Sequence, residues 1–273
     1  MVAALALGAA APPLPAATLV VCAPGYPGST AEAQPAMDAF AAAVGQAAGW
    51  PAGQLEAVYF ETEQGGLDRL ERDDAVLALV PLPFFLAHAE RLKLEPRAQA
   101  VLAGGQAAEP WSLVAATGAV ASAEGLAGYD LVSLAGYVPR FVRGPALGGW
   151  GEIPAGTRVT FSGAILSALR RAAAGAPVAV LLDGSQAASL PSLPFADKLT
   201  VVYRSPALPV SVLCRVGSRL PADRAVEVVE ALTTLGATPA GTEALAGLRL
   251  QGFIPVDRPA IEAARLAFAR AVE

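Results

Sequence analysis

Short apolar runs alternate with amphipathic segments through almost the whole chain, and this alternation limits the folds available to it. Runs such as 18–23 and 75–80 are uncharged and rich in Val, Leu and Ala, which is typical of strands buried on both faces. Repeated strand–helix units favour an α/β fold with parallel sheets. Strands are predicted at 18–23, 55–61, 75–80, 99–103, 111–116, 130–134, 158–161, 178–183, 199–204 and 210–216.

The segments between these strands carry the start and stop signals of helices. Ser29 and Glu32 have the spacing of a capping box, apolar residues recur at helical intervals after them, and Gly49 ends the segment. Pro83 suits the first turn of a helix, where no intrahelical N–H bond is lost. Further helices are predicted at 64–72, 83–92, 164–174, 223–235 and 259–272.

The length and composition bound the organisation of the chain. Its 273 residues are enough for two compact lobes or for one large α/β domain. Hydrophobic residues make up 54% of the chain and charged residues 16%, yet prolines interrupt the long apolar runs, so no membrane span is predicted. Residues 1–17 are either the remnant of a secretory leader, since 2–11 is apolar, or a flexible Ala/Pro extension.

Charge and metal-ligand content exclude several classes of function. The net charge is −5 and the 19 basic residues are scattered without forming a basic patch, so nucleic acid is not a predicted partner. With one His and no Cys pair at ligand spacing, no metal or other cofactor is predicted. Cys22 and Cys214 each lie in an apolar segment, which favours buried free thiols over a disulfide.

Four motifs follow one another along the chain. They are ALVPLPFFLA at 78–87, VAVLLDG at 178–184, VVYRSPALP at 201–209 and LRLQGFIPVD at 248–257. In this order and spacing they resemble the phosphonate/phosphite-type periplasmic substrate-binding proteins of ABC transporters, and the resemblance runs from about Leu19 to Asp257. It implies a receptor with two lobes that close on a solute and perform no catalysis.

The resemblance also implies how the chain is divided. The expected fold is the type II periplasmic-binding-protein fold, in which the chain crosses twice between two α/β lobes. We place the crossings near 105–111 and 205–209, so that lobe one comprises 18–108 and 208–273, and lobe two comprises 109–207. From strand–helix alternation alone, a single doubly wound domain remains an alternative.

The region that holds an oxyanion in the resembled family differs in this chain. In open α/β sheets, ligands bind beyond the carboxyl ends of the strands. The family uses a run rich in hydroxyl groups after the first strand of lobe two, at a helix N-terminus. The corresponding residues here, 134–141, contain no Ser or Thr, and Pro139 removes one N–H donor. The anion cradle is therefore predicted to be lost.

At other positions of the resembled family's binding site, polar residues are likewise replaced in this chain. A tyrosine expected in the proline turn of lobe one is replaced by Phe84 or Phe85, and a second ligand-binding tyrosine falls near Gln64. A histidine expected in lobe two falls near Ser162, whereas the acid that closes the later strand is retained as Asp183. The polar groups of the site are thus fewer, and aromatic groups replace some of them.

Two interpretations of these aromatic residues remain open. Each of them is, taken alone, more often a core residue than part of a ligand site, and basic residues beside them are more often solvated. Together they also fit an apolar cleft for a hydrophobic solute, oriented by a few polar groups. The predicted ligand-binding residues are Tyr26, Gln64, Phe84, Phe85, Glu109, Trp111, Tyr137, Arg140, Phe141, Asp183 and Gln186.

The predicted function is capture of a small, largely hydrophobic ligand and its delivery to a membrane transporter, by an exported, periplasmic, monomeric protein. Two alternatives stay open: a periplasmic carrier of lipid or sterol-like molecules, and an anion receptor with a rebuilt site. An enzyme is not predicted. His88 lies inside a predicted helix, and Gly184-Ser185-Gln186 lacks the pattern of a nucleophile elbow. No glycine-rich phosphate loop follows the first strand.

Overall fold

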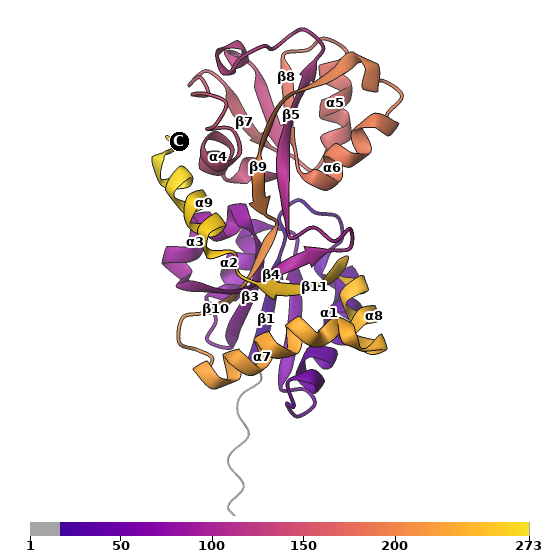
Figure 1. Ribbon diagram of the computed structural model, residues 1–273, viewed down its shortest axis with the longest axis vertical. Helices are drawn as coiled ribbons and strands as arrows, with labels where there is room; N and C mark the ends of the chain where they lie inside the picture. Colours follow the sequence, from indigo (N-terminus) through magenta and orange to yellow (C-terminus); the bar gives the residue numbers. More distant parts are fainter. Residues whose placement is uncertain (1–16, 273) are drawn as a thin grey trace, which may run out of the picture.

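The computed structural model describes residues 17–272, which form two α/β lobes stacked end to end (Figure 1). We call the part built on the six-stranded sheet lobe one and the part built on the five-stranded sheet lobe two. The strand order in lobe one is β11-β4-β10-β3-β1-β2, and in lobe two it is β7-β6-β8-β5-β9. The predicted two-lobed α/β fold is confirmed. The boundaries predicted for the lobes, 18–108 with 208–273 and 109–207, remain a prediction.

Lobe one contains the chain's two ends within the described range. Its strands are β1 (Ala17–Cys22), β2 (Leu55–Phe60), β3 (Ala75–Pro81), β4 (Leu94–Leu102), β10 (Ser211–Val216) and β11 (Leu250–Pro255). Its helices are α1 (Thr30–Ala47), α2 (Glu63–Leu70), α3 (Leu82–Leu92), α7 (Ala222–Thr234), α8 (Pro239–Gly247) and α9 (Arg258–Arg270). The capping box of Ser29 and Glu32 is present at the start of α1, as predicted.

Lobe two is built from the middle of the chain. Its strands are β5 (Ala108–Ala116), β6 (Asp130–Ser133), β7 (Arg158–Phe161), β8 (Val178–Leu182) and β9 (Leu199–Pro209). Its helices are α4 (Pro139–Phe141), α5 (Ile165–Ala173) and α6 (Gly184–Ser189), with short 3-10 or π segments such as η2 (Leu134–Tyr137) and η3 (Val142–Ala146). Within residues 17–272, no helix combines the length and the apolar character needed to cross a membrane.

The prediction of parallel sheets was wrong, because both sheets are mixed. β1 pairs in parallel with β2 and β3, and β6 with β7 and β8, but β10, β11 and β5 all make antiparallel pairs. The reason is connectivity: only Val210 separates β9 from β10, so the chain passes straight from one sheet into the other and enters lobe one against the direction of β3.

Four helices and strands were not predicted, namely α4, α6, α8 and β11, and three strands were predicted too short. β5 begins at Ala108 rather than at residue 111, and β9 extends to Pro209 rather than to residue 204. β4 begins at Leu94 rather than at residue 99 because Pro96 is accommodated at a register shift against β10, between Leu213 and Cys214. A proline that cannot donate to a sheet ladder is tolerated at such an irregularity.

The two lobes are joined by a pair of long strands. β5 and β9 run antiparallel, from Ala108 opposite Pro209 to Ala116 opposite Leu199. These strands lie side by side between the lobes in Figure 1. The segments predicted as crossings contain the ends of this pair that lie nearest lobe one.

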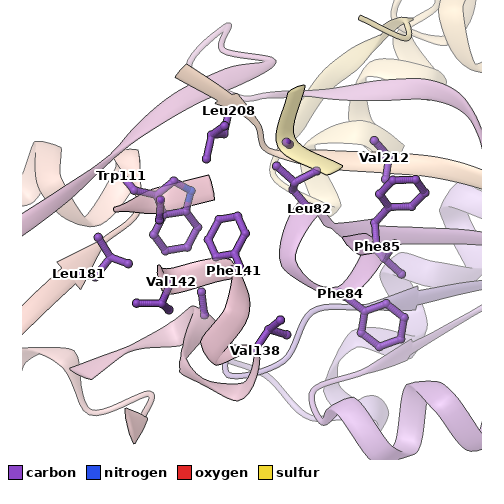
Figure 2. Packing of buried hydrophobic residues seen from close by; sticks show 14 of the residues in the cluster. Leu82, Phe84, Phe85, Trp111, Val138, Phe141, Val142, Leu181, Leu208 and Val212 are labelled. Atoms are coloured by element: carbon purple, nitrogen blue, oxygen red, sulfur yellow. The ribbon is translucent and has the colours of Figure 1, made fainter. Parts of the chain in front are cut away.

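One apolar core runs through both lobes. It includes Phe84 and Phe85 of α3, Trp111 of β5, Phe141 of α4 and Ile261 of α9. Figure 2 shows Phe141 with Trp111 on one side and Leu82 on the other. The rings of Trp111 and Phe141 meet edge to face, with centroids 5.1 Å apart. The lobes are therefore in apolar contact with each other in this conformation.

Helix α9 adds a second link between the lobes. It begins beside lobe one and packs along η3 of lobe two, where Gly144 leaves no room for a Cβ against the carbonyl of Ala267. Arg140 donates to the carbonyl oxygens of Phe268 and Ala269 at 3.2 and 3.3 Å, and its guanidinium lies 4.7 Å from the Phe268 ring centroid.

Replacing Phe84 by Ala should lower the free energy of unfolding by roughly 3–5 kcal/mol, because a large, fully buried ring leaves a cavity. Urea unfolding followed by circular dichroism measures this. The matched control is Phe161→Ala, since Phe161 is 44% exposed and should cost much less. Equal losses for the two variants would contradict the placement of Phe84 in the core.

Candidate functional site

A small pocket lies where the two lobes meet the paired strands. Its walls come from loops at strand ends in lobe one, from β5 and η2 of lobe two, and from the junction between β9 and β10. The lining residues are Pro24, Tyr26, Pro81, Pro83, Glu109, Trp111, Leu134, Ala135, Tyr137, Pro209 and Val210. In this conformation the cavity measures about 20 Å³, which is room for one water-sized group.

A hydrogen bond made by one of the lining residues joins the two lobes. The hydroxyl of Tyr26, in the loop after β1, donates to Oδ2 of Asp183 at the end of β8, over 3.0 Å. The same loop touches lobe two at Gly25, where φ is +80° and an added Cβ would clash with Leu134 and Phe161. Glycine is required there both for the backbone conformation and for the close approach.

Asp183 and Gln186 form a second capping box, at the start of α6. Oδ1 of Asp183 accepts from the backbone N–H of Gln186 at 2.8 Å, and the Gln186 side chain accepts from the backbone N–H of Asp183 at 3.2 Å. This arrangement fixes the orientation of the Asp183 carboxylate, which is 2% exposed. Gln186 thus serves to orient Asp183 and does not itself line the pocket.

Glu109 brings a second carboxylate to the same place. It lies on β5 opposite Leu208, is 8% exposed, and contacts Gly184 so closely that a Cβ there would overlap its carboxylate. Burial and, after it, the negative charge of Asp183 raise the pKa of Glu109 to about 7, against the opposing effect of the backbone N–H of Gly184. At neutral pH the Glu109 side chain is therefore partly protonated.

Tyr137 contributes an unsatisfied polar atom. Its hydroxyl oxygen is buried and makes no hydrogen bond of good geometry among residues 17–272, although the backbone N–H of Phe84 lies close enough to oppose the rise of its pKa; its ring meets that of Phe161 edge to face at 5.7 Å. Burial raises the pKa of Tyr137 well above its ordinary value, so the hydroxyl stays protonated. A buried hydroxyl without a partner costs free energy unless something binds it.

The remaining wall of the pocket is apolar. Trp111 is 7% exposed, and its backbone N–H donates to Oγ of Ser205 on β9 at 2.9 Å, which ties the indole to the crossing strands. Leu134, Val210 and four prolines complete the lining. The prolines follow or close strands β1, β3 and β9, so the sequence signal for these missed site residues was proline at a strand end.

Positive charge is lacking around this pocket. No Lys, Arg or His lines it, and among residues 17–272 no ion pair includes Glu109 or Asp183. Within residues 134–141, where the anion cradle was predicted to be lost, the backbone N–H of Ala135 already donates to Oγ of Ser133, at 3.1 Å. Within the same described range, no cluster of three His, Cys, Asp or Glu side chains has the arrangement of a metal site.

The structure brings together four of the predicted site residues at the pocket wall: Tyr26, Glu109, Trp111 and Tyr137. Asp183 joins them through its bond with Tyr26. Gln64 lies elsewhere, exposed on α2 and hydrogen-bonded to Asp68 at 2.6 Å. Arg140 is taken up by its contacts with α9.

The expectation that Phe84, Phe85 and Phe141 line a ligand cleft is not met in this conformation. All three are fully buried in the core that joins the lobes, and none lines the pocket. The physical reason is that α3 and α4 turn these rings toward the apolar contact between the lobes. The structure instead agrees with the alternative interpretation, in which these aromatic residues belong to the core.

Comparison with known proteins shows which protein family this chain is similar to. Residues 154–260 match the family model of ABC-transporter phosphonate periplasmic substrate-binding proteins. Among curated protein sequences, none matches the chain significantly. The matched segment runs from lobe two through the second crossing to the start of α9, and it includes Asp183 but not Glu109.

Three solved structures share the fold over nearly the whole chain. XAC2383 from Xanthomonas citri, solved bound to ATP, is 15% identical, with a TM-score of 0.73 over 94% of this chain and 100% of that one. A binding protein component of an ABC phosphonate transporter from Pseudomonas aeruginosa is 17% identical, with a TM-score of 0.63 over 90% and 83%. PhnD1 from Prochlorococcus marinus, in complex with methylphosphonate, is 13% identical, with a TM-score of 0.60 over 91% and 97%.

The fold and the family match make this chain similar to the two-lobed solute-binding proteins of ABC transporters. The resemblance to the phosphonate-type periplasmic substrate-binding proteins is confirmed. That family is one of binding proteins.

Glu109→Gln should remove a pH-dependent loss of stability. Since the native pKa is raised from 4.5 to about 7, the native state binds the proton more tightly, and the free energy of unfolding falls as pH rises through that window. At about 1.4 kcal/mol per pKa unit, the loss approaches roughly 3 kcal/mol by neutral pH. Urea unfolding of both proteins across this range measures the difference.

Glu243→Gln is the matched control, because Glu243 is an exposed acid on α8, outside the pocket. Its unfolding free energy should run parallel to that of the unmodified protein at every pH. If the Glu109→Gln curve were parallel as well, Glu109 would not be the buried, desolvated acid described above.

Proposed function

We propose that this chain captures a small, largely hydrophobic solute between its two lobes and presents it to a membrane transporter. The observation that carries the proposal is the pocket at the lobe junction, where apolar walls surround a few buried polar groups. Such a combination is typical of small-molecule sites, in which apolar contact supplies affinity and a few polar groups fix orientation. Export to the periplasm and a monomeric state are part of the same proposal.

The proposed capture requires the lobes to separate. The cavity of about 20 Å³ admits no more than a water-sized group in this conformation, so a larger solute must enter an opened form. The Tyr26–Asp183 bond joins the two lobes, and a hydrogen bond to a charged group contributes about 1.5–3 kcal/mol. The strands β5 and β9 can serve as the hinge, since both run from one lobe into the other.

Two other functions were weighed against this one. An anion receptor with a rebuilt site would follow the relatives solved with methylphosphonate or ATP. The absence of Lys, Arg and His from the pocket wall and the presence of Glu109 speak against anions. A lipid or sterol-like carrier would use the same apolar walls but a different recipient. We propose no catalytic role, in keeping with the binding-protein family that matches.

The uncharged fluorophore N-phenyl-1-naphthylamine should bind saturably, with one molecule per chain, and titration of its fluorescence measures this. Trp111→Ala should weaken the binding by about 1–3 kcal/mol, because an aromatic wall of the pocket is lost. The matched control is Trp150→Ala, since Trp150 is stacked on Tyr203 outside the pocket lining. Circular dichroism must first show both variants folded at the temperature of the titration. Unsaturable binding, or equal weakening by both variants, would contradict the proposed site.

A further inference from the structure

Helix α9 spans the lobe junction outside the pair of crossing strands. It follows β11 of lobe one, lies beside α3, and reaches η3 and β9 of lobe two. Figure 1 shows it in yellow, running from the lower lobe past the junction toward α4. The chain joins α9 to lobe one through β11, whereas lobe two holds it by non-covalent contacts alone. The contact with lobe two is therefore the one that can break when the lobes separate.

The start of α9 is fixed to lobe one. The backbone N–H of Asp257 donates to the side chain of Gln99 on β4, and Oδ1 of Asp257 accepts from the N–H of Ala260 at 3.0 Å, which caps the helix. Nearer the middle of the helix, the guanidinium of Arg265 lies 5.7 Å from the ring centroid of Phe85 on α3. These contacts keep the first half of the helix with lobe one.

The last turn of α9 is held on lobe two by Arg140 of α4. Its guanidinium donates to the carbonyl oxygens of Phe268 and Ala269 at 3.2 and 3.3 Å. Carbonyls at this end of a helix lack intrahelical partners, and a positive charge is favoured beside them. Among residues 17–272, no ion pair joins α9 to either lobe. Since water can replace Arg140 at both carbonyls, the helix end can leave and return.

Close packing at Gly144 of η3 sets how near this helix end approaches lobe two. A Cβ added to Gly144 would lie 2.6 Å from the carbonyl oxygen of Ala267 and 2.8 Å from the Cβ of Ala271. The nearest obstructing atom belongs to the backbone, so no side-chain rotation could relieve the clash. A side chain at this position would push the end of α9 away from lobe two.

We infer that α9 is a strap: residues 265–270 hold the lobes together in the absence of a solute and must leave α4 and η3 before a solute can enter. The cavity of about 20 Å³ at the junction makes entry depend on this release. Arg140, which the sequence analysis assigned to the ligand, serves the strap instead. The inference concerns the control of opening and goes beyond the capture proposed above.

Arg140→Met tests the strap, because it keeps a side chain of similar length and removes both hydrogen bonds. Its matched control is Arg170→Met, since Arg170 is exposed on α5 of lobe two. Small-angle X-ray scattering of the unliganded proteins measures how far the lobes are separated. The radius of gyration should be larger for Arg140→Met than for the unmodified protein and unchanged for Arg170→Met.

Gly144→Ala is a second variant that acts through packing rather than through hydrogen bonds, so the test does not depend on one substitution. Its matched control is Gly156→Ala, because Gly156 is exposed and an added Cβ there would meet nothing closer than 3.9 Å. Far-ultraviolet circular dichroism must first show each variant folded. The radius of gyration should again rise for the variant and not for its control.

Binding of N-phenyl-1-naphthylamine gives a readout that a merely structural helix would not move, and this arm rests on the proposed function. A protein that is mostly closed binds more weakly, by the fraction of molecules that are open. Loosening the strap should therefore raise the affinity of both variants, by roughly threefold to tenfold for the loss of one or two hydrogen bonds to the closed form. The gain should come from faster association, measured by stopped-flow fluorescence.

The outcomes separate this inference from the proposed function. Radii of gyration that match the controls in both variants would overturn the strap. Weaker binding of the fluorophore by both variants would overturn it too, because the docked helix would then favour the form that binds. Larger radii of gyration in both variants, without saturable binding by any of the five proteins, would support the strap and overturn the proposed function.

Discussion

The pairing of β5 with β9 is the interaction on which the rest of the structure depends. These strands are hydrogen-bonded from Ala108 opposite Pro209 to Ala116 opposite Leu199, so the two crossings of the chain form one ribbon rather than two independent linkers. The ribbon sets the direction in which β10 enters lobe one, which makes the sheet of that lobe mixed. It also carries Glu109 and Trp111 at the lobe junction and holds Trp111 through Ser205. Any movement of the lobes must bend this ribbon.

Around this pair of strands, apolar contact and buried charge have opposite effects on the stability of the closed conformation. The core that includes Phe85, Trp111 and Phe141 is continuous across the junction, so burial of apolar surface favours the closed conformation. In the same region burial and, after it, the negative charge of Asp183 raise the pKa of Glu109, which disfavours the ionised form of this side chain in the closed conformation.

The family likeness and the pocket chemistry describe different levels of function. The fold and the match over residues 154–260 make the scaffold similar to that of substrate-binding proteins. The solute itself depends on the side chains at the junction, because a shared fold hosts unrelated ligands. Here those side chains include an acid, aromatic residues and prolines, and residues 134–141 contain no Ser or Thr.

The sequence by itself determined most of the α/β elements, since apolar strand runs and the capping box of Ser29 with Glu32 are local properties. The two lobes were predicted only through the family resemblance that the order of four motifs carries. The sequence also nominated Tyr26, Glu109, Trp111, Tyr137 and Asp183, because strand ends and crossings are recognisable along the chain. Only the tertiary structure decided that Phe84, Phe85 and Phe141 fill the core, because the direction of a ring depends on what packs against its helix. The same holds for the meeting of Glu109 with Asp183. Residues so far apart in sequence become a pair only through the register of β5 against its neighbours, which no local pattern encodes.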